Sequence, residues 1–318
     1  MPANPSIKVG PLKQSELPEA ENIMRLAFGT FLGLPNPLDF GDDRNFLVPR
    51  FHSPNVKAIA ARDNGRLIGS NIVTRWGSFG FFGPLTVLPG YWDGGVAKRL
   101  MEATIKIFDR WGVRHAGLYT FAHSPKHMAL YQKFGFWPRY LTTIMTWTSE
   151  ASSTTLAEPP ALLSALPKRE RDQAIQACAK LTHGIDKGLD LTDEIRAALA
   201  QRTGDVVLAY SRGTLDAFAV CLHGAGSEGG QKICYVKFGA ARSGKGAAQR
   251  FDKLLQACEA FAASRGVTLE AGTNLAREHA YRTMRSRGYG VTIQGVAMQR
   301  PHISGFNHAE AYVIDDWR

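Results

Sequence analysis

The chain has 318 residues, of which 44% are hydrophobic and 21% are charged, and its formal net charge is +10. This length suits two domains of ordinary size, and the composition is that of a packed globular protein, which excludes a disordered chain. No apolar run approaches the roughly 18 to 20 residues that span a bilayer, so we expect no membrane segment.

The start of the chain and its cysteines indicate a cytoplasmic protein. Residues 1–20 lack a basic region followed by an apolar core, so we expect no secretory signal peptide. Four cysteines lie scattered in the second half, with no C-x-x-C pair and no histidine at metal-ligand spacing: Cys178, Cys221, Cys234 and Cys258. This pattern predicts reduced structural thiols and no metal site.

The positive charge is shared between the two halves and forms no run of like charges. A nucleic-acid-binding protein usually concentrates basic residues in a stripe with interleaved aromatic side chains, and the sequence has no such stripe. We therefore expect neither a nucleic-acid nor a membrane partner. Attraction of a small anionic ligand and solubility alone both remain as explanations of the charge.

In chain order, the first half reads as a mixed α/β unit with hairpin-connected strands first and helix-crossover strands later. A short strand at 7–12 precedes a helix at 15–31 that has Ser15 as its N-cap. Residues 32–55 are rich in Pro, Asp and Asn and predict a long loop with a short helix inside it. The elements expected next are a hairpin at 56–73, a strand at 79–88, a helix at 94–110, a strand at 114–121, a helix at 124–134 and a strand at 139–147.

The second half repeats landmarks of the first. Hairpin turns centred on Gly65 and Gly213 are followed by two further pairs of corresponding glycines, and the three separations are 148, 154 and 153 residues. The further pairs are Gly112 with Gly266 and Gly135 with Gly288. We interpret the chain as two copies of one unit: an N-terminal domain at 1–148, a Ser/Thr/Ala/Pro-rich linker at 149–167, and a C-terminal domain with a tail at 168–318.

The stretch LTVLPGYWDGGVAKRLME, residues 85–102, predicts an anion site. A strand ends at a proline, two glycines follow, and an amphipathic helix begins at once. Unpaired N–H groups and the positive end of the helix dipole favour an anion at such a terminus, and glycines let the backbone approach it closely. The alternative is an ordinary glycine-containing turn between a strand and a helix.

Two motifs in the first half resemble the GCN5-related N-acetyltransferases, the GNAT superfamily. One is V-x-P followed by G-x-G/A at the start of a helix, and the other is a helix ending in Y-x-x-x-G-F; they correspond to 87–89, 95–97 and 124–136. The resemblance covers residues 6–148 and extends more weakly to 170–300. It implies a mixed α/β (α+β) fold of two tandem acyl-CoA N-acyltransferase-like domains. Each would have a mostly antiparallel central sheet with splayed central strands, flanked by helices.

The resemblance implies that acetyl-CoA binds where the fourth and fifth strands of a domain splay apart. Val87 and Leu88 would pair their backbone groups with the pantetheine arm, as an added strand does. The pyrophosphate would lie on the helix N-terminus, whose expected contacts are Gly94, Gly95, Val96, Ala97, Lys98 and Arg99. The chain departs from the family at Trp92, where Gln or Arg is usual, and the neighbouring Asp93 would repel phosphate.

For the chemistry, the resemblance places Tyr131 where many family members carry a general acid that protonates the leaving thiolate. A phenol with a pKa of about 10 is protonated at neutral pH and can donate; the alternative is a core tyrosine on an amphipathic helix. His123 follows the fifth strand and is a candidate general base or a merely solvated side chain. The first half has no cysteine for an acyl-enzyme, so we expect direct transfer in a ternary complex. The residue equivalent to Tyr131 in the second copy is Met284, which predicts a degenerate copy.

Three rival interpretations stay open. The chain could be a non-catalytic acyl-CoA-binding or regulatory protein, as Trp92 and the lack of a carboxylate on the fourth strand suggest. Activity could reside in the second copy, which carries Asn274, Arg277 and Tyr281. The stretch GAARSGKG, residues 239–246, nearly matches a nucleotide-binding P-loop but ends in glycine where Ser or Thr would ligate magnesium.

The expected acceptor is the amine of a small molecule or a peptide. The long loop and the strand after the hairpin offer an aromatic wall for it: Phe28, Phe31, Leu32, Phe40, Phe46, Phe51, Phe79, Phe81 and Phe82. Asp39, Asp42 and Asp43 could attract a cationic amine or could equally serve as loop caps. A homodimer is kept open as the assembly.

Overall fold

The computed structural model describes residues 6–149 and 159–318, and its first half follows the predicted order of elements. These are β1 (Ile7–Pro11), α1 (Leu17–Leu32), α2 (Val48–Phe51), β2 (Val56–Asp63), β3 (Arg66–Trp76), β4 (Phe79–Phe82), β5 (Thr86–Val87), α3 (Val96–Trp111), β6 (His115–Thr120), α4 (Pro125–Gln132) and β7 (Trp137–Trp147). Two expectations were wrong in detail. The strand predicted at 79–88 is two strands, because Pro84 has no N–H for the ladder. Ser15 lies in a short 3-10 helix, and Glu16 is the N-cap of α1.

The second half repeats the same series. It contains β8 (Ala161–Leu162), α5 (Lys168–Ile185), α6 (Thr192–Ala200), β9 (Gly204–Ser211), β10 (Thr214–Gly224), β11 (Gly230–Ala241), α7 (Ala247–Ala263), β12 (Thr268–Asn274), α8 (Glu278–Ser286), β13 (Gly290–Arg300) and β14 (Val313–Ile314). Of the predicted linker, residues 150–158 lie outside the described residues, whereas β8 pairs with β9 at an edge of the sheet.

The structure supports the repeat at the level of backbone geometry. Asn64–Gly65 and Arg212–Gly213 both have positive φ, as a two-residue hairpin turn requires. Gly95 and Gly246 are the N-caps of α3 and α7, with φ of 76° and 83°. The strand pairs β4–β6 and β11–β12 are both parallel, and each is connected through the helix that its glycine begins.

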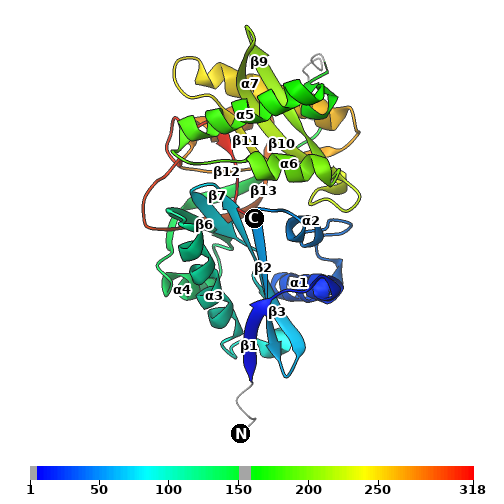
Figure 1. The fold of residues 1–318 in the computed structure, drawn as a ribbon, viewed down its shortest axis with the longest axis vertical. Coiled ribbons are helices and arrows are strands. Elements are labelled where there is room, and N and C mark those ends of the chain that lie inside the picture. Colours follow the sequence, from blue (N-terminus) through cyan, green and yellow to red (C-terminus); the bar gives the residue numbers. More distant parts are fainter. Residues whose placement is uncertain (1–5, 150–158) are drawn as a thin grey trace.

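One continuous sheet of fourteen strands joins the two copies (Figure 1). Its order is β1-β2-β3-β4-β6-β13-β7-β12-β11-β10-β9-β8, with β5 beside β3 and β14 beside β11. The strands that follow α4 and α8 are therefore exchanged: β13 lies between β6 and β7, and β7 lies between β13 and β12. Each half completes the sheet of the other, which the sequence did not predict.

A shared hydrophobic core lies between the halves. Trp76 of β3 contacts Phe81 and Phe238, with ring centroids 4.6 and 5.5 Å apart. Trp317, near the end of the chain, packs on Phe79 at 5.0 Å. This end of the chain lies at the centre of the molecule in Figure 1. Burial of large aromatic side chains from both copies ties them together.

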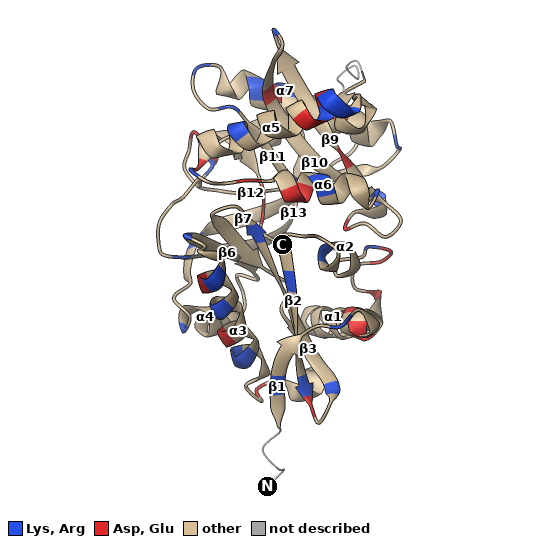
Figure 2. Ribbon diagram, in the orientation of Figure 1, with Lys and Arg blue, Asp and Glu red and all other residues tan. Residues whose placement is uncertain are grey.

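Charged residues of both signs are scattered over both halves (Figure 2). One group is buried at the junction: Arg50 of α2 forms an ion pair with Glu228, and Lys237 of β11 donates to the same carboxylate at 3.0 Å. Arg50 also donates to the carbonyl of Gly83 at 2.7 Å, at the point where β4 ends. Within the described residues, no helix is both long and apolar enough to cross a membrane.

Candidate functional site

In the first copy, two adjacent strands diverge. The parallel pairing of β4 and β6 ends at Phe81 and Gly117. The chain then leaves through Gly83 and Pro84, and β5 continues beside β3, with Val87 opposite Gly69. The edge of β5 that faces β6 consequently has no partner strand in the described chain. Backbone groups at such an edge need another partner, and an extended ligand can supply it. We call this gap the first opening.

The N-terminus of α3 lies directly after β5 and its turn. Gly95 is the N-cap in a left-handed conformation, and no described side chain caps the helix. A Cβ built on Gly95 would meet nothing within 4 Å, while Val96 is buried and anchors the first turn. The unpaired N–H groups of this turn and the helix dipole are suited to an anion. The glycine turn and the helix start lie where the sequence predicted them, and anion binding at residues 94–97 stays a prediction.

The two predicted basic residues differ in their availability. Lys98 is 64% exposed and has only a loose pair with Glu102, at 3.9 Å. Arg99 donates to the carbonyl of Ile7 at 2.9 Å, so its guanidinium holds β1 against the helix. Lys98 is thus the more available cation for a bound phosphate.

The backbone groups of Val87 and Leu88 already have partners. The indole nitrogen of Trp92 donates to the carbonyl of Val87 at 2.8 Å, and Leu88 donates its N–H to Ile68 at 2.9 Å. A carbonyl oxygen can accept a second hydrogen bond, so the Trp92 contact does not close this group to a ligand. Trp92 is 38% exposed.

An ion pair spans the first opening on its outer side. Lys126, in the first turn of α4, lies 2.5 Å from the carboxylate of Asp93, in the turn before α3. Both side chains are well exposed, so the pair contributes little to stability. Its formation neutralises the acidic group that the sequence placed beside the anion site.

Tyr131 lies on α4 and faces the sheet. It is 8% exposed and packs edge-on against Phe82 of β4, with ring centroids 5.7 Å apart, and near Phe136 and Leu118. Burial raises the pKa of Tyr131 above its ordinary value, because the phenolate would lose its hydration. The phenol is therefore protonated at neutral pH and lies beside the strand that ends at the first opening.

His123 and His127 lie together at the start of α4. The ring of Phe31, from the end of α1, is stacked on His123 at 5.5 Å and contacts His127 at 5.0 Å. His127 is half-buried, and burial lowers its pKa, with Lys126 and His123 adding to the effect. His127 is one helical turn before Tyr131 and so shares its face of α4. Sequence reasoning missed His127, although the i, i+4 spacing to Tyr131 could have identified it.

Part of the predicted aromatic wall packs around α1. Phe28 stacks on Phe40 at 4.9 Å, and Phe31 packs on Phe121 at 5.1 Å, beside the end of β6. In contrast, Phe79 and Phe81 lie in the core between the halves.

The three acidic residues of the long loop are loop caps in this structure. Asp42 forms an ion pair with Lys232 at 2.6 Å. Asp43 accepts the N–H of Gln231 at 2.8 Å, and Asp39 accepts from Asn36. Two of the three carboxylates therefore attach the loop to the start of β11.

In the part of the chain that the structure describes, the second copy keeps an uncapped helix N-terminus at Gly246, but it lacks the tyrosine and the unfilled gap of the first copy. Met284 is fully buried at the position of Tyr131. Of GAARSGKG, residues 239–241 belong to β11, which leaves too short a turn for a P-loop. Asn274 donates to Thr142, Arg277 pairs with Asp315, and the gap between β11 and β12 contains the end of the chain.

Comparisons with known proteins agree with this architecture. Residues 20–136 match the model of the acetyltransferase (GNAT) family. No curated protein matches the sequence significantly. The family match includes the α3 turn and Tyr131.

Solved structures show the fold of the whole chain. A protein from Pyrococcus horikoshii described as a candidate acetyltransferase has 15% identity and a TM-score of 0.70, covering 98% of this chain and 95% of its own. A GCN5-related N-acetyltransferase from Sphaerobacter thermophilus has 15% identity and a TM-score of 0.59, covering 94% and 96%. A tandem GNAT protein from the clavulanic acid biosynthesis pathway has 13% identity and a TM-score of 0.57, covering 92% and 98%. Residues 20–136 thus match the acetyltransferase (GNAT) family, and the whole chain has the fold of tandem GNAT proteins.

Proposed function

We propose that this chain is an N-acetyltransferase that moves an acetyl group from acetyl-CoA to the amine of a small molecule or peptide, in the first opening. The observation that carries the proposal is the uncapped N-terminus of α3 at Gly95, which faces open space beside the unpaired edge of β5. The family match over residues 20–136 supports the same location.

The first opening has groups suited to each part of acetyl-CoA. The first-turn N–H groups at Gly95, Val96 and Ala97, with Lys98, would hold the pyrophosphate. The free edge of β5 would hold the pantetheine arm after Trp92 shares or releases the carbonyl of Val87. Acetyl-CoA supplies an activated thioester, so the protein has to position an amine and manage protons.

Tyr131 is the proposed proton donor to the leaving thiolate. Its phenol is protonated at neutral pH and is shielded from bulk water, which would strengthen a hydrogen bond to the thiolate. His127 is the better-placed proton acceptor for the amine, because its lowered pKa keeps the imidazole neutral and it shares the Tyr131 face of α4. Since the first half has no cysteine, the amine would attack the thioester directly.

A non-catalytic acyl-CoA-binding protein is the second candidate. The Trp92–Val87 hydrogen bond favours it, because it occupies a backbone group that a bound pantetheine arm would use. Both candidates predict that acetyl-CoA binds, but only the enzyme predicts turnover. The release of CoA thiol in the presence of a panel of primary amines, corrected for hydrolysis of acetyl-CoA without an amine, distinguishes them.

The first test is calorimetric titration of acetyl-CoA into the full chain and two matched variants. Gly95→Glu places a carboxylate and a strained side chain at the N-cap of α3, and we expect binding to be lost. Gly246→Glu makes the same change at the N-cap of α7 and should leave binding intact. Normal binding by Gly95→Glu, or loss only in Gly246→Glu, would contradict the proposed location.

A further inference from the structure

The gap between β11 and β12 in the second copy corresponds to the first opening, and we call it the second opening. The parallel pairing of β11 and β12 ends at Val236 and Ala271. From there β14 pairs with β11, with Ile314 opposite Gly239. On the other side Asp315 donates its N–H to the carbonyl of Gly272 in β12, at 2.9 Å. Residues 309–317, which we call the tail segment, therefore lie between the two diverging strands.

The tail segment enters between the N-terminal ends of α7 and α8. The carbonyl of Ala309 accepts the N–H of His279, in the first turn of α8, at 3.3 Å. Tyr312 packs between Phe251 of α7 and His279, with ring centroids 5.4 and 6.2 Å apart. The N-terminus of α7 has no side-chain cap among the described residues, like that of α3 beside the first opening.

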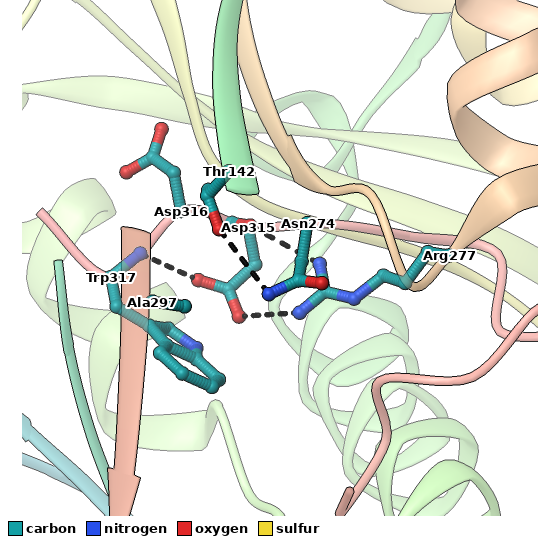
Figure 3. Close-up of a pocket in the computed structure, with 7 residues that line it drawn as sticks. All are labelled: Thr142, Asn274, Arg277, Ala297, Asp315, Asp316 and Trp317. Atoms are coloured by element: carbon teal, nitrogen blue, oxygen red, sulfur yellow. Dashed lines mark hydrogen bonds and ion pairs between the residues drawn. The ribbon is translucent and has the colours of Figure 1, made fainter. Parts of the chain in front are cut away.

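One fully buried arginine holds the middle of the tail segment. Arg277 donates to the carbonyls of Val313 and Asp315, at 3.2 and 3.1 Å, and forms an ion pair with the Asp315 carboxylate at 3.3 Å. Figure 3 shows Arg277 reaching Asp315 while Asn274 turns towards Thr142. The space between these side chains has no room for a water molecule. A buried arginine without its counter-charge is strongly destabilising, so removal of the tail segment from Arg277 would be costly.

The tail segment then crosses into the first copy. Trp317 packs on Gly117 of β6 and on Phe79 of β4, the two strands that diverge at the first opening. A side chain at Gly117 would collide with the Trp317 ring, and one at Gly272 would collide with Asp316. The glycines of both copies are therefore fitted to the tail segment.

We infer that the second opening is a binding site for an extended peptide, that its ligand is the tail segment of the same chain, and that each chain consequently has one acyl-CoA site. The acyl-CoA part rests on the proposed function of the first opening. A pantetheine arm in the second opening would have to displace β14 and leave the buried Arg277 without its ion-pair partner Asp315. The peptide ligand also links the second copy to the divergence point of β4 and β6.

A disulfide can test whether the tail segment stays in place during acetyl-CoA binding. A Cβ built on Gly239 would lie 3.5 Å from the Cβ of Ile314, within the range that a disulfide spans. We would oxidise the full-length Gly239→Cys/Ile314→Cys variant with oxidised glutathione, confirm the bond by mass spectrometry, and titrate acetyl-CoA into oxidised and reduced forms. Ile314→Cys alone is the matched control.

We expect the disulfide to form in most chains, with one acetyl-CoA bound per chain and a Kd within twofold in both forms. Loss of one bound acetyl-CoA on oxidation, or inhibition of cross-linking by saturating acetyl-CoA, would overturn the inference. A disulfide that forms in a protein that binds no acetyl-CoA in either form would support the peptide site and contradict the proposed function.

Hydrogen exchange on the unmodified chain gives an independent measurement. Ala241 donates to Tyr312 at 3.0 Å, and Asp315 donates to Gly272, so both amides should exchange slowly. Their exchange should be unchanged by saturating acetyl-CoA. Faster exchange at either amide on addition of acetyl-CoA would show that the tail segment leaves, and would overturn the inference even if the cysteine variant does not fold.

Discussion

The indole of Trp92 is hydrogen-bonded to the carbonyl of Val87 at 2.8 Å, across the turn between β5 and α3. The two residues lie on the two features that make the first opening: the free edge of β5 and the N-terminus of α3. Any ligand that pairs with β5 has to share this carbonyl or displace the indole. Trp92 is therefore in a position to set the affinity of the first opening for acetyl-CoA.

Trp92→Phe keeps an aromatic ring and removes the N–H donor. We expect acetyl-CoA to bind about three- to tenfold more tightly, because one net hydrogen bond of about 1 kcal/mol no longer competes for Val87. Calorimetric titration measures the change, and Trp137→Phe, at an exposed residue of β7, is the control. Weaker binding by Trp92→Phe would instead make the indole part of the acetyl-CoA site.

Tyr131→Phe tests the proposed proton donor. Turnover should fall by about 10²- to 10⁴-fold, the range for loss of a general acid, while the Kd for acetyl-CoA changes less than twofold. Tyr289→Phe is the control in the second copy, where the tyrosine is also buried. Steady-state kinetics and thermal melts on both variants separate a chemical effect from a folding defect. Turnover that survives in Tyr131→Phe would assign the tyrosine to the core alone.

The two histidines at the start of α4 make different predictions. The pKa of His127 is lowered from its ordinary value by burial first and by Lys126 and His123 second. If His127 accepts the amine proton, kcat/KM falls as the pH drops through this lowered pKa, because the protonated imidazole is no base. His127→Gln should lower turnover at least about tenfold and remove this limb of the pH profile.

His123→Gln is the matched comparison, since His123 stacks on the same Phe31 ring but is exposed. We expect its pH profile to keep the limb. A limb that disappears in His123→Gln and persists in His127→Gln would return the role to the residue that the sequence predicted.

The sequence was sufficient for the features that local patterns determine. The hairpins, the turn at Gly95 and the helix that carries Tyr131 all follow from glycine positions and from the spacing of apolar residues, and the repeat follows from their recurrence. The exchange of β7 and β13 could not be predicted, because both strands are exposed at the start and buried towards the end, so their local patterns do not distinguish the copy that each one joins. The two halves accordingly share one sheet, and binding experiments require the full chain.

Local sequence patterns also could not predict which residues contact one another within the site. The sequence shows Trp92 as a departure from the family, but the hydrogen bond from its indole to the carbonyl of Val87 depends on how the turn between β5 and α3 folds back. The contacts of Asp42 with Lys232 and of Asp43 with Gln231 depend on β11, nearly 190 residues further along the chain. Contacts at such separations are set by tertiary packing, which one sequence does not reveal.

The buried junction charges make the last prediction. Burial alone would raise the pKa of Glu228, but the charges of Arg50 and Lys237 outweigh it and lower the pKa to about 2. Glu228→Gln leaves two buried cations without their counter-charge, so we expect a loss of about 3–5 kcal/mol in the free energy of unfolding at pH 7. Glu278→Gln removes an exposed i, i+4 pair with Arg282 and should cost less than about 1 kcal/mol.

The pH dependence of this loss has a definite sign. The folded pKa of Glu228 lies below the ordinary value of 4.5, so the unfolded chain binds the proton more readily. The stabilisation by this carboxylate is therefore complete above about pH 5 and is lost as the pH falls from there towards 2. Urea titrations of wild type and Glu228→Gln at pH 7, 5, 4 and 3 should show a stability difference that is constant between pH 7 and 5 and shrinks below. A difference that stays constant down to pH 3 would mean that Glu228 is not held ionised by Arg50 and Lys237.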